Sequence, residues 1–331
     1  MNQNFDVVGI GNALVDILAR VEEEFLTENG IEKGIMHLID RPRAAELYGQ
    51  MGPATEISGG SGANTIAGLA MLGAQAAYVG KVKDDQLGAI FAHDIRAQGA
   101  IFETPLAAKG ADHETGRCMV LVSPDGERSM NTYLGVSEHL APADIDVGVM
   151  GAANWLYLEG YRFDGAESHE AFAKAIAACK RAGGKASVTL SDPFCVDRHR
   201  DAFRRMIRDD LDLLFANEHE LMSLYQTGSL PEALGACAED VQLAAVTVGP
   251  DGAWVIENGA RTHVPTRPAT VIDATGAGDL FAAGFLHGLT QGRPLADCGR
   301  MGCIAAGEII GHIGARPETD LKSLMEEAGL G

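Results

Sequence analysis

The chain has 331 residues, of which 46% are hydrophobic, so it can bury a large core in one big α/β domain or two smaller ones. Its formal net charge of −20 argues against a nucleic-acid-binding surface and against docking on anionic lipid. The absence of a long apolar run, of a signal-peptide pattern at residues 1–11 and of any C-x-x-C pair predicts a cytoplasmic protein with reduced thiols and no membrane contact.

The first predicted element is a buried strand, Phe5-Asp6-Val7-Val8-Gly9-Ile10-Gly11, which ends in glycine. Its two glycines match the start of a dinucleotide-binding fingerprint. Leu14, however, stands where the third glycine belongs, and no matching acid ends a strand about 20 residues further on. A dinucleotide-dependent oxidoreductase is therefore disfavoured.

Two short strands near the N-terminus do not fit between the helices of a doubly wound sheet, so we expect them to form part of a small β lid. A hairpin turned by Pro124-Asp125-Gly126 supplies the rest. The lid is thus predicted at about 13–40 and 104–133. Asn12 and Asp16 lie where it begins, and their spacing alone indicates only a turn asparagine and a strand aspartate.

A glycine- and serine-rich loop, Ser58-Gly59-Gly60-Ser61-Gly62-Ala63-Asn64, leads into a helix of small residues at 65–72. Such a loop is a modest signal for an anion or for a ligand that approaches the backbone closely. It is not a G-x-S-x-G nucleophile elbow, because Ala63 stands where the last glycine belongs.

From residue 154 onward, apolar strands alternate with helical segments, which predicts a parallel sheet covered by helices. Such sheets bind ligands beyond the carboxyl ends of their strands, where this chain has Tyr161, Ser191–Phe194 and Asn217–Glu220. The asparagine and glutamate of the last segment are three residues apart at a helix start, the usual spacing of a capping box. A tight turn between two strands follows at Gly249-Pro250-Asp251-Gly252.

The most informative stretch is Asp273-Ala274-Thr275-Gly276-Ala277-Gly278-Asp279, after which apolar residues recur with helical spacing. It brings small residues and then an acid to a helix N-terminus, where free amides and the helix dipole favour a phosphate. On this pattern Asp279 is either a capping acid or the base that receives a hydroxyl proton beside a phosphoryl group. No Walker A sequence is present, which excludes a P-loop kinase. A last long helix is expected at 295–312.

This stretch resembles the second signature of the ribokinase-like (PfkB-type) kinases, D-T-x-G-A-G-D, with Ala274 where threonine is commoner. The glycine- and serine-rich loop resembles their first signature, and Gly11-Asn12-Ala13-Leu14-Val15-Asp16 is similar to the opening of adenosine kinases within that family. The resemblance implies one kinase domain over 1–331, with a three-layer α/β/α fold: a doubly wound, mostly parallel sheet with a small β-strand lid. It also implies a transferase that uses ATP and Mg²⁺.

The resemblance assigns roles to individual residues. Asp279 would be the base, and the amides of Gly276, Ala277 and Gly278 would form the anion hole. Substrate contacts would come from Asn12, Asp16, Gly59, Gly60, Asn64, Leu134 and Tyr161. Nucleotide contacts would come from Asn217, Glu220, Thr247, Gly249, Gly252 and Thr275. Glu220 would also hold Mg²⁺ through water, and Asp273 would be the candidate ligand of a monovalent cation such as K⁺.

The predicted reaction is transfer of the γ-phosphoryl group of ATP to the 5′-hydroxyl of a nucleoside, adenosine giving AMP. Sugar kinases of the family tend to carry Asp-x-Asn-x-Arg where this chain has Ser191-Asp192-Pro193-Phe194-Cys195-Val196, a segment that resembles adenosine kinases. A sugar such as ribose or fructose is the alternative acceptor. A non-catalytic nucleoside-binding relative is disfavoured because Asp279 and the loop glycines are all present. The sequence leaves monomer and homodimer open.

Overall fold

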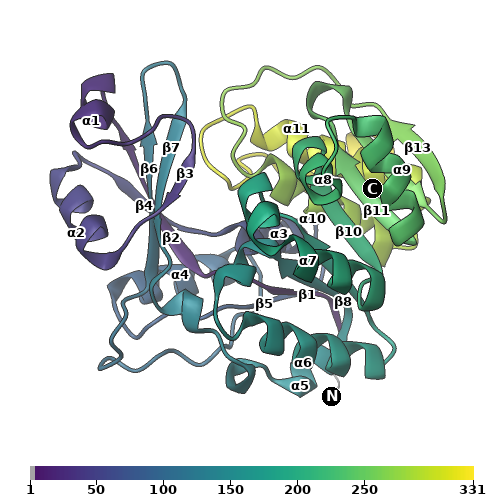
Figure 1. The fold of residues 1–331 in the computed structure, drawn as a ribbon, viewed down its shortest axis with the longest axis horizontal. Coiled ribbons are helices and arrows are strands. Elements are labelled where there is room, and N and C mark those ends of the chain that lie inside the picture. The colour runs from purple at the N-terminus through teal and green to yellow at the C-terminus, as the bar shows by residue number, and fades with distance from the viewer. Residues whose placement is uncertain (1–3) are drawn as a thin grey trace.

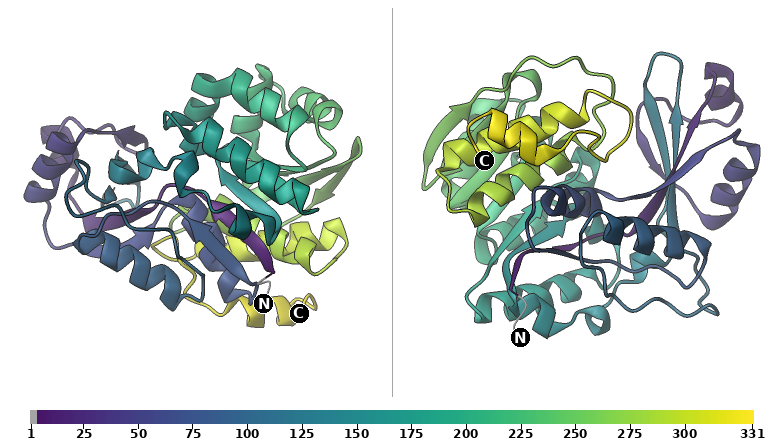
Figure 2. Two further views of the ribbon diagram at one scale, coloured as in Figure 1. Left: turned by 90° about the horizontal axis from the view of Figure 1, so that it is seen from below. Right: turned by 180° about the vertical axis from the view of Figure 1, so that it is seen from behind.

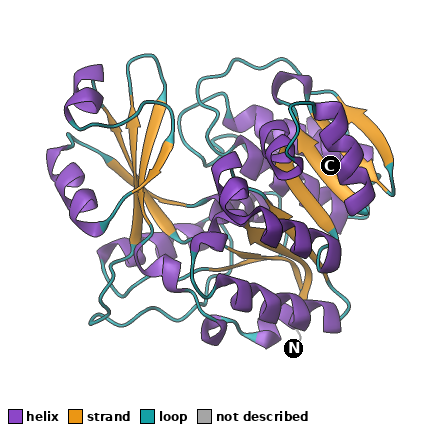
Figure 3. Ribbon diagram, in the orientation of Figure 1, coloured by secondary structure: helices purple, strands orange, loops and turns teal. Residues whose placement is uncertain are grey.

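The computed structural model describes residues 4–331 and arranges their strands in two sheets (Figures 1 and 3). The strands of the larger, eight-stranded sheet are β1 (Phe5–Ile10), β5 (Ala76–Val79), β8 (Ala153–Glu159), β9 (Lys185–Thr189), β10 (Leu213–Asn217), β11 (Leu243–Thr247), β12 (Ala253–Glu257) and β13 (Ala260–Val264). Their order is β13-β12-β11-β10-β9-β8-β1-β5. From β5 to β11 all neighbours are parallel, and β12 and β13 extend one edge in antiparallel fashion.

Helices bury both faces of this sheet. One core contains α3 (Ser61–Met71), α4 (Gln86–Ala97), α10 (Ala277–Thr290), α11 (Leu295–Ile309) and α12 (Leu321–Glu327); the other contains α5 (Val147–Gly151), α6 (Ser168–Arg181), α7 (Pro193–Asp209), α8 (Glu218–Tyr225) and α9 (Leu230–Asp240). Because side chains alternate along a strand, Val7 of β1 packs into the first core and Val8 into the second. The predicted three-layer α/β/α fold is confirmed. Within residues 4–331, none of the helices has both the length and the apolar character that a bilayer crossing requires.

The second sheet stands to one side of the larger body in Figure 1 and in the right-hand view of Figure 2. Its five strands, in the order β3-β7-β6-β2-β4, are β2 (Leu14–Arg20), β3 (Met36–Leu38), β4 (Thr55–Gly59), β6 (Gly116–Val122) and β7 (Arg128–Tyr133). We call it the lid sheet. Val15 and Met119 on one face join the core to which α1 (Glu23–Glu28) and α2 (Arg41–Gln50) contribute. Asp16 and Cys118 point from the opposite face into a cavity.

Several elements differ from what the pattern predicts. The lid sheet includes β4, whose mostly polar residues gave no strand signal; it pairs with β2. α3, predicted at 65–72, begins at Ser61 and ends at Met71. α7, predicted at 202–208, begins at Pro193, because Asp192 caps it by accepting a hydrogen bond from the Cys195 amide at 2.6 Å. The helix expected at 295–312 ends at Ile309, and the chain then turns back through Gly314, whose φ of +115° suits glycine.

Candidate active site

A cavity of about 870 Å³ lies between the lid sheet and the carboxyl ends of the strands in the large sheet. Two of the predicted site residues, Gly59 and Gly252, do not line it. The others all do: Asn12, Asp16, Gly60, Asn64, Leu134, Tyr161, Asn217, Glu220, Thr247, Gly249, Asp273, Thr275, Gly276, Ala277, Gly278 and Asp279. Residues scattered over the whole chain therefore meet at one site, as expected where parallel strands end.

The two exceptions have structural roles. The Asp16 carboxylate packs directly on Gly59, where a Cβ would lie 2.3 Å from the carboxylate carbon. Gly252 has φ of +97°, and a Cβ there would lie 2.2 Å from the carbonyl oxygen of Val264. Gly59 thus makes room for a site residue, and Gly252 makes the turn that follows β11.

The N-terminus of α10 presents free backbone amides to the cavity. Gly276 is the N-cap residue, with φ of +80° and no side-chain cap. The first hydrogen bond of the helix runs from the Leu280 amide to the Gly276 carbonyl at 2.9 Å, so the amides of Gly278 and Asp279 precede it. The Ala277 amide, predicted as part of the anion hole, instead donates to the Ala274 carbonyl at 3.2 Å. Together with the positive end of the helix dipole, these amides form a site suited to a phosphate.

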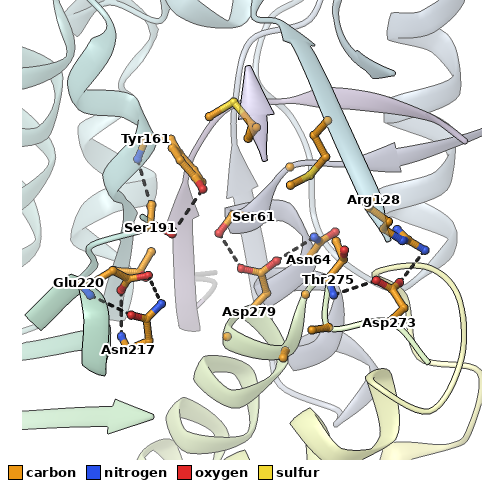
Figure 4. A pocket seen from close by; sticks show the side chains of 18 of the residues that line it. Ser61, Asn64, Arg128, Tyr161, Ser191, Asn217, Glu220, Asp273, Thr275 and Asp279 are labelled. Atoms are coloured by element: carbon orange, nitrogen blue, oxygen red, sulfur yellow. Dashed lines mark hydrogen bonds and ion pairs between the residues drawn. The ribbon is translucent and has the colours of Figure 1, made fainter. Parts of the chain in front are cut away.

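Asp279 does not cap this helix. Its Oδ1 accepts a hydrogen bond from Ser61 Oγ at 2.6 Å, and its Oδ2 accepts one from Asn64 Nδ2 at 2.8 Å (Figure 4). Both donors belong to the first turn of α3, so the carboxylate is held between two helix N-termini. Burial raises the pKa of Asp279 above its ordinary range, against the opposing effect of the two hydrogen bonds. The geometry and the raised pKa both suit a base.

Asn217 and Glu220 form the capping box that their spacing predicts. The Glu220 amide donates to Asn217 Oδ1 at 2.9 Å, and the Asn217 amide donates to Glu220 Oε2 at 2.9 Å (Figure 4). Glu220 is buried at the cavity wall, and burial, with Asp192 and Asp279 nearby, raises its pKa to about 7. Within residues 4–331 no three acidic, histidine or cysteine side chains are close enough to bind one metal directly. An anionic, oxygen-only set of this kind fits Mg²⁺ held through water.

Asp273 is already paired with a cation of the protein. Arg128, on β7 of the lid sheet, places Nη2 2.6 Å from Asp273 Oδ2, and both side chains are almost fully buried (Figure 4). The amides of Thr275 and Gly314 donate to the two carboxylate oxygens at 3.0 and 2.9 Å. Each oxygen of Asp273 therefore accepts a backbone amide, and the charge of the carboxylate is balanced by Arg128.

A buried polar network forms the floor of the cavity. Glu159, the last residue of β8, accepts hydrogen bonds from Asn12 Nδ2 at 3.1 Å and from the Gly62 amide at 2.7 Å. Asn12 Oδ1 in turn accepts from Arg162 Nη1 at 3.0 Å. Asn12 thus links Glu159 to Arg162 at the floor, and one of the two N–H donors of its side-chain amide is used in doing so.

The lid sheet gives the cavity an apolar wall. Met36, Cys118 and Met130 point inward from β3, β6 and β7, and Leu134 follows at the base of the lid. Tyr161 lies opposite, where its hydroxyl donates to the Ser191 carbonyl at 3.3 Å and its amide donates to Ser191 Oγ at 3.1 Å (Figure 4). The cavity therefore combines an apolar side with a polar floor.

Comparison with known proteins agrees with this architecture. A family model described as pfkB family carbohydrate kinase matches residues 35–321. The chain belongs to the PfkB family.

Two solved structures are similar to this PfkB-family kinase over nearly their whole length. A probable sugar kinase from Rhizobium etli CFN 42 has a TM-score of 0.94 and 48% identity, covering 99% of each chain. The adenosine kinase from Sinorhizobium meliloti has a TM-score of 0.93 and 47% identity, covering 98% of this chain and 99% of that one. The ATP-dependent ribose-1-phosphate kinase of Halopiger xanaduensis is 32% identical over 275 residues, 81% of this chain and 87% of the relative. As a member of the family, the chain is a phosphotransferase acting on a sugar or nucleoside hydroxyl.

Three site residues of this PfkB-family kinase were not found from the sequence. Glu159 had a usable signal, because it is the only charged residue in Trp155–Glu159 and stands where a parallel strand ends. Arg128 follows the predicted hairpin turn and is indistinguishable there from a solvated strand charge. Ser61 lies within the first glycine loop, but its hydroxyl gains a role only because α10 packs beside α3.

The raised pKa of Glu220 predicts how stability changes with pH. A carboxyl whose pKa is raised to about 7 on folding binds a proton in the folded state at pH values where the unfolded chain has released it, so its contribution to stability falls as pH rises from about 4.5 to 7. We expect Glu220→Gln, which keeps the shape of the capping box, to melt close to wild type at pH 5 and roughly 3 °C or more above it at pH 8. Calorimetry of the ligand-free proteins measures this gap, and a gap that is the same at both pH values contradicts the prediction.

Proposed function

We propose that this kinase transfers the γ-phosphoryl group of ATP to the 5′-hydroxyl of a nucleoside, adenosine giving AMP. The observation that carries the proposal is the composition of the cavity: Asp16, a carboxylate suited to a pair of hydroxyls, lies on the same lid face as Met36, Cys118 and Met130. A free sugar is polar on most sides and leaves such a wall uncovered. A nucleoside presents a diol and a flat apolar base together.

The charge and position of Asp16 support ribose binding. It lies on β2 opposite Ile57 of β4, with its carboxylate against Gly59. Burial raises its pKa to about 6, with Arg316 and Arg128 opposing that effect. At neutral pH the group is ionised and accepts hydrogen bonds from two adjacent hydroxyls, a pairing that a buried carboxylate otherwise lacks. The S. meliloti neighbour, named as an adenosine kinase, supports the same acceptor class.

The chemistry follows from the arrangement around α10. Asp279 takes the proton from the 5′-hydroxyl as that oxygen bonds to the γ-phosphorus, and the bond from this phosphorus to the β,γ-bridging oxygen breaks to release ADP. The free amides of Gly278 and Asp279 stabilise the charge on the transferring group, and a single such donor is typically worth about 3 kcal/mol. Glu220 would hold Mg²⁺ through water, and the bound ion would supply further neutralisation of the phosphate charge. Asp279 returns its proton to solvent when the product leaves.

A direct test measures ADP formation with adenosine, guanosine, inosine, ribose, ribose 1-phosphate and fructose as acceptors. We expect kcat/KM for adenosine to exceed that for ribose and fructose by roughly 100-fold or more, since the apolar wall contributes only with a base present. A sugar with the higher kcat/KM would make this a sugar kinase. Acceptor-independent ADP formation alone would remove the kinase function.

We further propose that Arg128 takes the place of a monovalent cation at Asp273. The guanidinium supplies positive charge to a carboxylate whose oxygens already accept two amide hydrogen bonds. Replacing K⁺ by tetramethylammonium at constant ionic strength is therefore expected to change kcat by less than about twofold, because no charge is left to neutralise at this carboxylate. The control repeats the assay with Na⁺. Stimulation by K⁺ of fivefold or more would restore Asp273 as a cation ligand.

A further inference from the structure

Three consecutive residues after α11 contact both halves of the site. The Gly314 amide donates to Asp273 Oδ2 at 2.9 Å. Ala315 packs under Gly276, where an added Cβ would lie 3.0 Å from the Ala315 Cβ. Arg316 reaches in the other direction, to the lid sheet, where its Nη2 donates to the Ser58 carbonyl at 3.0 Å and to Ser58 Oγ at 3.2 Å. This segment therefore joins the loop before α10 to strand β4.

Arg316 lies behind the acceptor site. Its side chain is buried and does not line the cavity, so it is not placed to contact a ligand. Its Nε and Nη1 are buried without a hydrogen-bond partner, which is costly for a guanidinium unless its charge is compensated nearby. Ser58, to which it is bonded, precedes Gly59, the residue on which the Asp16 carboxylate packs.

The compensating charges are the two acids of the proposed reaction. The positive charge of Arg316 lowers the pKa of Asp16 and of Asp279, against the larger effect of burial on each. The other charged group that favours ionisation of Asp16 is Arg128 on β7. Asp279 has no second cation; its other partners are the neutral donors of α3, and its own charge opposes that of Asp16.

Two further groups face the guanidinium. Asp94 on α4, whose Oδ2 accepts the Ser58 amide at 3.1 Å, adds negative charge near the guanidinium. Tyr78 on β5 is buried beside it, and burial raises the pKa of this phenol well above its ordinary value, so it stays neutral. Arg316 is thus the cation that the two cavity acids have in common.

We propose that Arg316 is a positioning residue of this kinase: it fixes Ser58 and Gly59 behind Asp16 and places one buried positive charge behind the acceptor site. The kinetic consequences of this inference rest on the proposed function. The effect of Arg316 on how stability changes with pH does not.

The kinetic experiment compares Arg316→Met, Arg316→Lys and a matched control, Arg96→Met. Arg96, like Arg316, donates to a backbone carbonyl, that of Phe102 at 3.0 and 2.6 Å, but the residue is exposed and faces neither acid. We expect Arg316→Met to raise the KM for the acceptor about tenfold and to move the acid limb of kcat/KM upward by about one pH unit, with the KM for ATP unchanged. Arg316→Lys, which keeps the charge, restores most of the pH profile, and Arg96→Met leaves it in place.

Melting curves give a readout that needs no activity. Without Arg316 both acids become harder to ionise in the folded state, so the variant loses more stability than wild type as pH rises. We expect the melting temperature of Arg316→Met to lie several degrees further below that of wild type at pH 8 than at pH 5. The difference between Arg96→Met and wild type should be the same at both pH values.

The inference is overturned if the difference between Arg316→Met and wild type is the same at both pH values, or if the variant keeps the wild-type pH profile and acceptor KM. If Arg316→Met does not fold, the same two measurements on Arg316→Lys and Arg316→Gln decide, since only the lysine keeps the charge. Failure of wild type to phosphorylate any acceptor refutes the proposed function alone.

Discussion

Replacing Asp279 by asparagine is expected to lower kcat about 1,000-fold, because the reaction loses the group that receives the hydroxyl proton. Asparagine has the same shape and keeps an oxygen for the hydrogen bond from Ser61 Oγ, so the N-terminus of α10 keeps its place. In the proposed mechanism ATP contacts this helix end through backbone amides, so its dissociation constant should stay within about twofold. Initial rates with saturating adenosine measure kcat, and calorimetric titration with ATP measures affinity.

Two controls separate loss of the base from loss of structure. Ser61→Ala removes one hydrogen bond to the same carboxylate and is expected to cost about tenfold in kcat, which is far less than loss of the base. The pH profile is the second control: wild type should lose activity as Asp279 becomes protonated, and the residual activity of Asp279→Asn should lack that acid limb. Turnover of the asparagine variant within tenfold of wild type would mean that another group takes the proton.

The N-terminus of α10 could be predicted because its signal is local in sequence. Two glycines and an acid directly before an apolar helical pattern specify a helix N-terminus with accessible amides, whatever the rest of the chain does. The structure places Gly276 at the N-cap and leaves the amides of Gly278 and Asp279 free. The alternation of strands and helices after residue 154 was equally informative, because each strand and its covering helix are adjacent in the chain.

The buried arginines around the site could not be predicted, because the residues to which they are hydrogen-bonded are far away in sequence. Arg316 and Ser58 are separated by 258 positions, and Asn12 and Arg162 by 150. Neither arginine belongs to a motif, and each meets its hydrogen-bond partner only in the folded chain. The pattern at Asn217 and Glu220 showed the opposite difficulty: a capping box and a magnesium-organising pair share one spacing, and here the same two residues form the cap at the wall of the cavity.

Two polar residues near the start of the lid differ in how far the protein satisfies them. Asn12 reaches the cavity with its side-chain oxygen bonded to Arg162 and one of its two N–H donors bonded to Glu159. Within residues 4–331, the Asp16 carboxylate accepts no hydrogen bond from a protein donor, and the positive charges that lower its pKa are those of Arg316 and Arg128. An unsatisfied carboxylate beside an apolar wall is the arrangement that a ligand diol would complete.

Asp16→Asn is accordingly expected to raise the KM for adenosine roughly 50-fold, with kcat changed by less than about threefold. The ligand diol loses one of the two carboxylate oxygens that accept its hydrogen bonds, together with the negative charge, while the reacting groups stay in place. The substitution keeps the packing against Gly59, so lost stability is not expected to account for the higher KM.

The sharper measurement tests the variant with 2′-deoxyadenosine and 3′-deoxyadenosine. Each should be a poor acceptor for wild type but nearly as good as adenosine for Asp16→Asn, because the hydroxyl and the carboxylate contribute only together. Burial raises the pKa of Asp16 to about 6, so in wild type the KM for adenosine should rise as pH falls below that value, and in the variant it should not. If each deoxynucleoside raises KM by the same factor in both proteins, the ribose lies away from Asp16 and the nucleoside binds in the opposite orientation.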